Sequence, residues 1–151
     1  MFFIAHRGNI SGPNKLENHP DHILTAIKLG YDVEVDVWLI DNKMYSGHDA
    51  PLYLFNVPNE YRDKIWFHCK NINALVYLLQ SYIKHKCFCH EQDDYSIVSP
   101  TNHIWTYPGL TLTPLSIAVL PETVCFNQKL LYACSGICSD YIKKYKENIN
   151  E

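Results

Sequence analysis

The chain has 151 residues, of which 47% are hydrophobic and 19% are charged, and its formal net charge is −3. This composition excludes a predominantly disordered chain, and without a basic surface no nucleic-acid partner is expected. We expect a single domain over residues 1–151, because about 100–200 residues usually form one domain. An ordinary eight-fold (β/α) barrel needs about 250 residues, so a complete one is excluded.

The N-terminus and the cysteines indicate the compartment of the protein. The chain begins with a short apolar stretch that lacks the basic region and the length of a signal peptide. No apolar run approaches the roughly 18 residues of a membrane span, so we expect no integral membrane segment. Without a secretion signal, the six cysteines are expected to be reduced thiols, and the protein is expected to be cytoplasmic.

Apolar periodicity and turn residues predict a chain in which short strands outnumber the helices. In chain order we predict a strand at 2–6, a helix at 19–29, strands at 31–40, 43–47 and 65–70, a helix at 73–84, strands at 87–90, 95–99, 104–107, 116–120 and 136–138, and a helix at 141–149. The first helix has Pro20 in its first turn and Gly30 just after its end, which are favourable positions for both residues.

Polar residues follow the predicted strands at their carboxyl ends. They are His6, Asp36, His68, His90, Tyr107, Glu122 and Asp140. Active sites of α/β barrels form at that end of the strands, yet only two long helices lie between the strands here. We therefore predict an α/β fold, a shortened or incomplete TIM-like (β/α) barrel with several helices replaced by loops.

Glu34 and Asp36 form the first group of residues that could carry chemistry. Residues two apart on a strand point to the same face, so both carboxylates enter the same space. Two buried like charges repel each other, and a hard divalent cation such as Mg²⁺ or Ca²⁺ would remove that repulsion. The alternative is a solvent-facing polar edge of an amphipathic strand.

Two histidines, His6 and His48, form the second group. Each ends a strand or a hairpin arm, and together they could supply a general base and a general acid near neutral pH. Arg7 offers a planar guanidinium that suits a phosphate, and Gly8 permits a sharp turn beside it. The alternative is two histidines on surface loops.

Together these motifs resemble the glycerophosphodiester phosphodiesterase family of the phospholipase C-like phosphodiesterases. The resemblance covers residues 4–49 and rests on His6-Arg7-Gly8, Glu17-Asn18, the strand at 30–37 and Gly47-His48-Asp49. It implies a metal-dependent enzyme that cleaves a small, glycerophosphodiester-like phosphodiester. His6 and His48 would be the catalytic acid/base pair, Glu34 and Asp36 would bind the metal, and Arg7 would contact the phosphate.

The chain departs from the family pattern at the third metal ligand. The family usually carries an acidic residue two positions before a lysine, and here His68 precedes Lys70. Either His68 is the metal ligand, or Glu91 or Glu122 from another strand replaces the carboxylate. By the same resemblance Lys70 would contact the phosphate, and Glu17 is a further residue of the site.

Two other functions remain open from the sequence. The short chain and His68 would also suit a non-catalytic phosphate-binding or scaffold protein on a decayed barrel. A zinc- or iron-dependent hydrolase could instead use the histidines at the strand ends as ligands. These histidines are His6, His48, His68 and His90.

Overall fold

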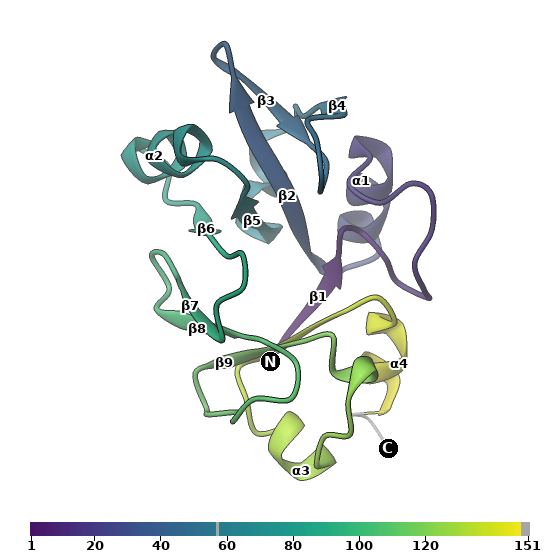
Figure 1. The fold of residues 1–151 in the computed structure, drawn as a ribbon. Helices are drawn as coiled ribbons and strands as arrows, with labels where there is room; N and C mark the ends of the chain where they lie inside the picture. The colour runs from purple at the N-terminus through teal and green to yellow at the C-terminus, as the bar shows by residue number, and fades with distance from the viewer. Residues whose placement is uncertain (57, 149–151) are drawn as a thin grey trace.

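A computed structural model describes residues 1–56 and 58–148 as a mixed α/β fold with one curled sheet and few helices (Figure 1). The strands are β1 (Phe2–His6), β2 (Asp32–Ile40), β3 (Lys43–Ser46), β4 (Tyr53–Leu54), β5 (Ile65–Cys69), β6 (Lys86–Phe88), β7 (Tyr95–Val98), β8 (His103–Thr106), β9 (Ser116–Val119) and β10 (Gly136–Ser139). The helices are α1 (Pro20–Lys28), α2 (Ile72–Gln80), α3 (Gln128–Leu131) and α4 (Ile142–Asn148), with 3-10 turns η1 (Asn59–Lys64) and η2 (Pro121–Thr123).

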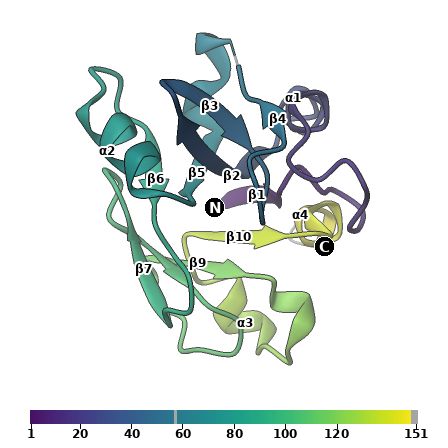
Figure 2. The ribbon, with the colours of Figure 1, turned by 45° about the horizontal axis from the view of Figure 1, so that its top comes forward.

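The parallel part of the sheet has the order β6-β5-β2-β1-β10-β9-β8, and β7 pairs antiparallel with β8. The hairpin strands β3 and β4 extend the far half of β2. The sheet curls, as Figure 2 shows, and brings β6 near β7. There Cys87 and Ser99 exchange two backbone hydrogen bonds of 2.9 Å each, which link the two ends of the curled sheet.

The connections between parallel strands explain why the chain is short. Helices α1, α2 and α3 make the connections from β1 to β2, from β5 to β6 and from β9 to β10. The connection from β2 to β5 is made by β3, β4 and η1, and that from β6 to β8 by β7. The α/β class and the loss of helices are as predicted, whereas a TIM-like barrel is not confirmed.

Local sequence signals account for the elements nearest the site. His19 caps α1, its side chain accepting a hydrogen bond from the Asp21 amide, and Pro20 occupies the first turn. Strand β2 alternates as predicted, with Val33, Val35 and Val37 buried against the helices. The predicted second helix ends early, since α2 stops at Gln80 and the next residue is extended.

The curled sheet separates two apolar cores. One lies between the outer face of the sheet and its covering helices and loops. The other lies inside the curl, beneath the carboxyl ends of the strands, and consists of Ile4, Trp66, Phe88, Val98, Trp105, Ile117, Val119 and Cys138. The polar ends of β1, β2 and β5 therefore lie above an apolar, largely aromatic core.

The sequence predicted that no segment spans a membrane and that the cysteines are reduced thiols. Within residues 1–56 and 58–148, no helix is long and apolar enough to cross a membrane. All six cysteines are free, as predicted. Burial raises the pKa of the Cys138 thiol well above its ordinary value, so this thiol is held neutral.

Candidate metal and phosphate site

The strand register brings the predicted site residues together at one end of the sheet. His6 of β1 lies beside Glu34 of β2, and Asp36 lies beside His68 of β5. Because β1, β2 and β5 run parallel, their polar carboxyl ends meet above the inner core. The spacing of two residues along β2 then directs both of its carboxylates into the same space.

Glu34, Asp36 and His68 form a compact cluster of potential metal ligands. Each offers one ligand atom, and these atoms lie within 4.8 Å of one another. Glu34 is 1% exposed, Asp36 is 0% exposed and His68 is 9% exposed. The alternative of a solvent-facing polar edge is therefore wrong for this strand.

The ring of His68 faces both carboxylates. Its Nδ1 lies 2.8 Å from Asp36 Oδ1 and 3.6 Å from Glu34 Oε1, while its Nε2 donates to the His90 carbonyl oxygen at 2.8 Å. Burial lowers the His68 pKa, but the contacts with Asp36 and Glu34 outweigh it and raise the pKa to about 9. In the metal-free protein His68 is therefore a cation between two anions.

The two oxygens of Asp36 have different surroundings. Its Oδ2 accepts from the Asn18 amide at 2.8 Å and lies 3.1 Å from Arg7 Nε. Its Oδ1 is buried and has no aligned hydrogen-bond donor, although His68 Nδ1 is close. Burial raises the pKa of Asp36, but His68 and Arg7 outweigh burial and lower it strongly.

The cluster fits a divalent cation. Oδ1 of Asp36, an oxygen of Glu34 and Nδ1 of His68 all converge, and the two buried carboxylates repel each other wherever no cation lies between them. The hydrogen bond from His68 to His90 is the arrangement by which metal-ligating histidines are usually oriented. An imidazole in the donor set favours softer ions such as Zn²⁺ or Fe²⁺ over Mg²⁺ and Ca²⁺, whereas the two carboxylates suit the harder ions.

His6 belongs to a carboxylate–histidine pair that the sequence did not predict. Its Nδ1 lies 2.8 Å from Asp140 Oδ1, and its Nε2 lies 3.9 Å from Glu34 Oε2. Burial lowers the His6 pKa, but the hydrogen bond to Asp140 and the charge of Glu34 outweigh burial and raise it. Asp140 was recognisable only as a polar residue after the last strand.

Arg7 organises the carboxylates as well as facing the pocket. Its backbone amide donates to Glu34 Oε2 at 3.1 Å, and its Nη1 donates to Glu17 Oε2 at 3.2 Å. Glu17 also accepts a hydrogen bond of 2.9 Å from Asn9. Glu17 therefore holds Arg7 and is not brought into the group of potential metal ligands.

The site at the carboxyl ends of β1, β2 and β5 opens onto a pocket of about 230 Å³. It is lined by His6, Arg7, Glu34, His48, His68, Lys70, His90, Glu91, Trp105, Tyr107, Pro108, Val119 and Leu120. The His48 side chain is 42% exposed, and its Nδ1 lies 2.6 Å from Asp49 Oδ1. The structure thus brings both predicted catalytic histidines to one pocket, with His6 at the end of β1 and His48 on a partly exposed loop.

The remaining predicted residues have different places. Lys70 lines the pocket, and within the part of the chain that the structure describes its side chain has no hydrogen bond or ion pair. Glu91 lines the pocket but lies outside the ligand cluster. Glu122 accepts from the Ser139 hydroxyl and the Asp140 amide, each at 2.9 Å, so it supports the end of β10.

Comparisons with known proteins give no family for this chain. It matches no protein-family model, no curated protein and no solved structure. The function of the site must therefore be inferred from its own residues, above all from the buried cluster of Glu34, Asp36 and His68.

Proposed function

We propose that the protein is a divalent-metal-dependent phosphodiesterase that cleaves a small, glycerophosphodiester-like phosphodiester. The observation that carries the proposal is the buried cluster of Glu34, Asp36 and His68, which adjoins a pocket also lined by His6 and His48. On this proposal the curled sheet is an incomplete TIM-like barrel, and its polar end is the active site. The free thiols support a reducing, cytoplasmic location.

Glu34, Asp36 and His68 would hold the metal ion. When bound, a divalent cation supplies Lewis-acid polarisation of the phosphoryl oxygens and a hold on the nucleophile. The His90 carbonyl keeps the His68 Nε2–H engaged, which leaves Nδ1 facing the carboxylates. Binding a cation there requires His68 to give up its Nδ1 proton, so metal and proton compete for this cluster.

His6 is suited to the role of general acid. Asp140 fixes the ring through Nδ1, and Nε2 is the nitrogen on the side of Glu34 and the pocket. The contacts that raise the pKa of His6 favour its protonated form, from which Nε2 would donate a proton to the leaving oxygen of a phosphodiester. The carboxylate partner stabilises the imidazolium before that transfer.

His48 and Lys70 complete the functional groups of the pocket. His48 is the second histidine at the pocket, and in the proposal it accepts the proton of the attacking hydroxyl or water. Lys70 is the cation for the phosphate, because Arg7 is already engaged with Glu17, Glu34 and Asp36. This division of roles keeps a free positive charge at the pocket.

Replacing the cluster carboxylates tests the proposal. Glu34→Gln and Asp36→Asn keep the shape but remove an anionic ligand, so each should abolish tight metal binding in calorimetric titrations with Mg²⁺, Ca²⁺, Mn²⁺ and Zn²⁺. Turnover of a chromogenic phosphodiester with the preferred metal should fall in the same variants, while Glu147→Gln, on an exposed face of α4, should match the wild type. His6→Ala should cut turnover by about 10²–10⁴-fold.

Two results would contradict the proposal. Unchanged metal affinity in both cluster variants would place the metal elsewhere. A wild-type protein that is inert on every diester, with each metal supplied, would remove the catalytic assignment.

A second candidate, a non-catalytic phosphate-binding protein, is favoured by one observation. The negative charge of Asp36 is already balanced by the Arg7 guanidinium and the protonated His68 ring. The cluster therefore does not need a metal ion to neutralise this carboxylate. Metal analysis and a diester assay of the purified protein separate the functions. A bound divalent metal with diester turnover supports the phosphodiesterase, and zinc or iron without diester turnover supports a histidine-rich hydrolase. No metal with retained phosphate binding supports this second candidate.

A further inference from the structure

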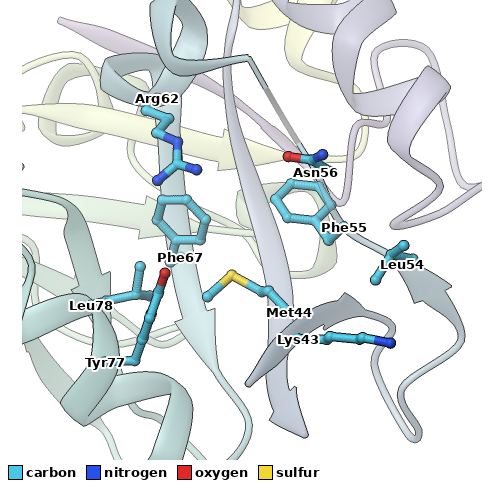
Figure 3. A pocket seen from close by; sticks show the side chains of 9 residues that line it. All are labelled: Lys43, Met44, Leu54, Phe55, Asn56, Arg62, Phe67, Tyr77 and Leu78. Carbon is cyan, nitrogen blue, oxygen red and sulfur yellow. The ribbon is translucent and has the colours of Figure 1, made fainter. Parts of the chain in front are cut away.

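A second pocket of about 230 Å³ lies on the outer face of the sheet, where the chain lacks a crossover helix. The link from β2 to β5 is made by β3, β4 and η1, and Figure 3 shows the space these elements leave beside α2. Phe67 and His68 are neighbours in β5, so their side chains point to opposite faces of the sheet. Phe67 faces this outer pocket, while His68 faces Glu34 and Asp36 on the inner side.

The floor of the outer pocket is apolar. Phe67 is 3% exposed, Leu78 is 2% exposed and Phe55 is 7% exposed, and Met44 lies between them in Figure 3. The rings of Phe55 and Phe67 meet edge to face, with centroids 6.4 Å apart. Such a floor suits one aromatic ring or a short alkyl chain, because 230 Å³ is about eight times the ~30 Å³ that a water molecule occupies in the liquid.

One end of the outer pocket is cationic. In Figure 3 the Arg62 guanidinium extends from η1 towards Phe67, and the Asn56 amide lies near the same end. Among residues 1–56 and 58–148 the Arg62 side chain has no hydrogen bond or ion pair, whereas Arg7 is held by carboxylates. The pKa of the neighbouring His85 is lowered mainly by burial and also by the positive charge of Arg62.

We propose that this outer pocket binds a small amphipathic carboxylate, an anion whose head pairs with Arg62 and whose short apolar body lies over Phe67, Met44 and Leu78. A guanidinium binds a planar carboxylate through two parallel hydrogen bonds, so Arg62 suits an anionic carboxylate head. The apolar side chains beside it suit an apolar body on the same ligand. The volume lies below the range of about 300–1,000 Å³ that drug-sized ligands occupy, which limits the body to about one ring or eight carbons. The site is independent of the function proposed for the inner pocket.

Octanoate is the probe for this proposal, and 1-octanol is its neutral control of equal length. A titration followed by amide chemical shifts should give a dissociation constant of about 0.1–1 mM for octanoate, with the shifts gathered around Met44, Phe67 and Leu78. Octanol should bind at least about tenfold more weakly than octanoate, because it lacks the charge that pairs with Arg62. Arg62→Gln should weaken octanoate by about the same factor and leave octanol unchanged.

Two further variants make the result decisive. Arg62→Lys keeps the charge but not the paired hydrogen-bond donors, so octanoate affinity should fall between those of the wild type and Arg62→Gln. Lys129→Gln, an exposed cation on α3, should bind octanoate like the wild type. Equal binding of octanoate and octanol, unchanged affinity in Arg62→Gln, or shifts gathered around the inner pocket would each overturn the proposal.

Discussion

The charge of His68 should govern how the stability of the metal-free protein depends on pH. Its pKa is about 9 in the folded protein and 6.5 ordinarily, so the folded state holds a proton that the unfolded chain releases. This contribution to the free energy of unfolding is fully present below pH 6.5 and is lost as the pH rises through 9. The side chain is only 11% exposed, so screening by solvent is weak.

The size of this effect follows from the two pKa values. At about 1.4 kcal/mol per pH unit, the gap between them corresponds to about 3 kcal/mol of stability at low pH. About 2 kcal/mol of it should be lost between pH 6.5 and 8.5, because the proton is only partly released at the upper limit. Urea unfolding with a chelator present, at several pH values in this range, measures the loss.

His68→Asn is the matched variant for this measurement. It has no titrating group at this position, so its stability should change less with pH than that of the wild type, whatever the other groups contribute. The difference between the two slopes isolates His68. Equal slopes would refute the reasoning, because they would show that His68 is neutral in the folded protein and that its contact with Asp36 is not ionic.

Two further variants separate a chemical role from a structural one near β10. Asp140→Asn removes the carboxylate that raises the pKa of His6, so an NMR titration should show a lower His6 pKa than in the wild type. Turnover should fall at neutral pH in the same variant. An unchanged His6 pKa would count against the His6–Asp140 pair. Glu122→Ala leaves the Ser139 hydroxyl and the Asp140 amide without their acceptor, which should cost about 1–3 kcal/mol in urea unfolding. Its metal affinity should match the wild type, and a large loss would restore Glu122 as a ligand.

Local patterns predicted most of the strands and the site residues that they carry. The strict alternation in β2 placed Glu34 and Asp36 on the face opposite Val33 and Val35, and the structure confirms both faces. The strand ends at His6 and His68 were also visible as polar residues after apolar runs. These features depend on periodicity and turn chemistry, which short segments of sequence contain.

The partners of those residues could not be predicted in the same way. Asp140 pairs with His6 although 134 positions separate them, and Asn18 holds Asp36 from a loop. No local spacing marks such pairs, because they follow from how the strands are ordered in the sheet. The sequence predicted the strand at 43–47 and no helix before the next strand, but it did not show β4, η1 or the outer pocket at Arg62 that these elements form.

The pairing of β1 with β10 has a kinetic consequence. These strands contain the first and last parts of the sheet, so closing the contact between them costs more chain entropy than any pairing of strands nearer in sequence. Topologies with such distant contacts fold slowly, and we expect this contact to form after the local strand–helix units. A nascent chain that lacks β10 can already carry Glu34, Asp36 and His68, but His6 acquires its carboxylate only when the final strand arrives. The His6–Asp140 pair, and with it the general acid of the proposed function, would then form only when β10 joins the sheet.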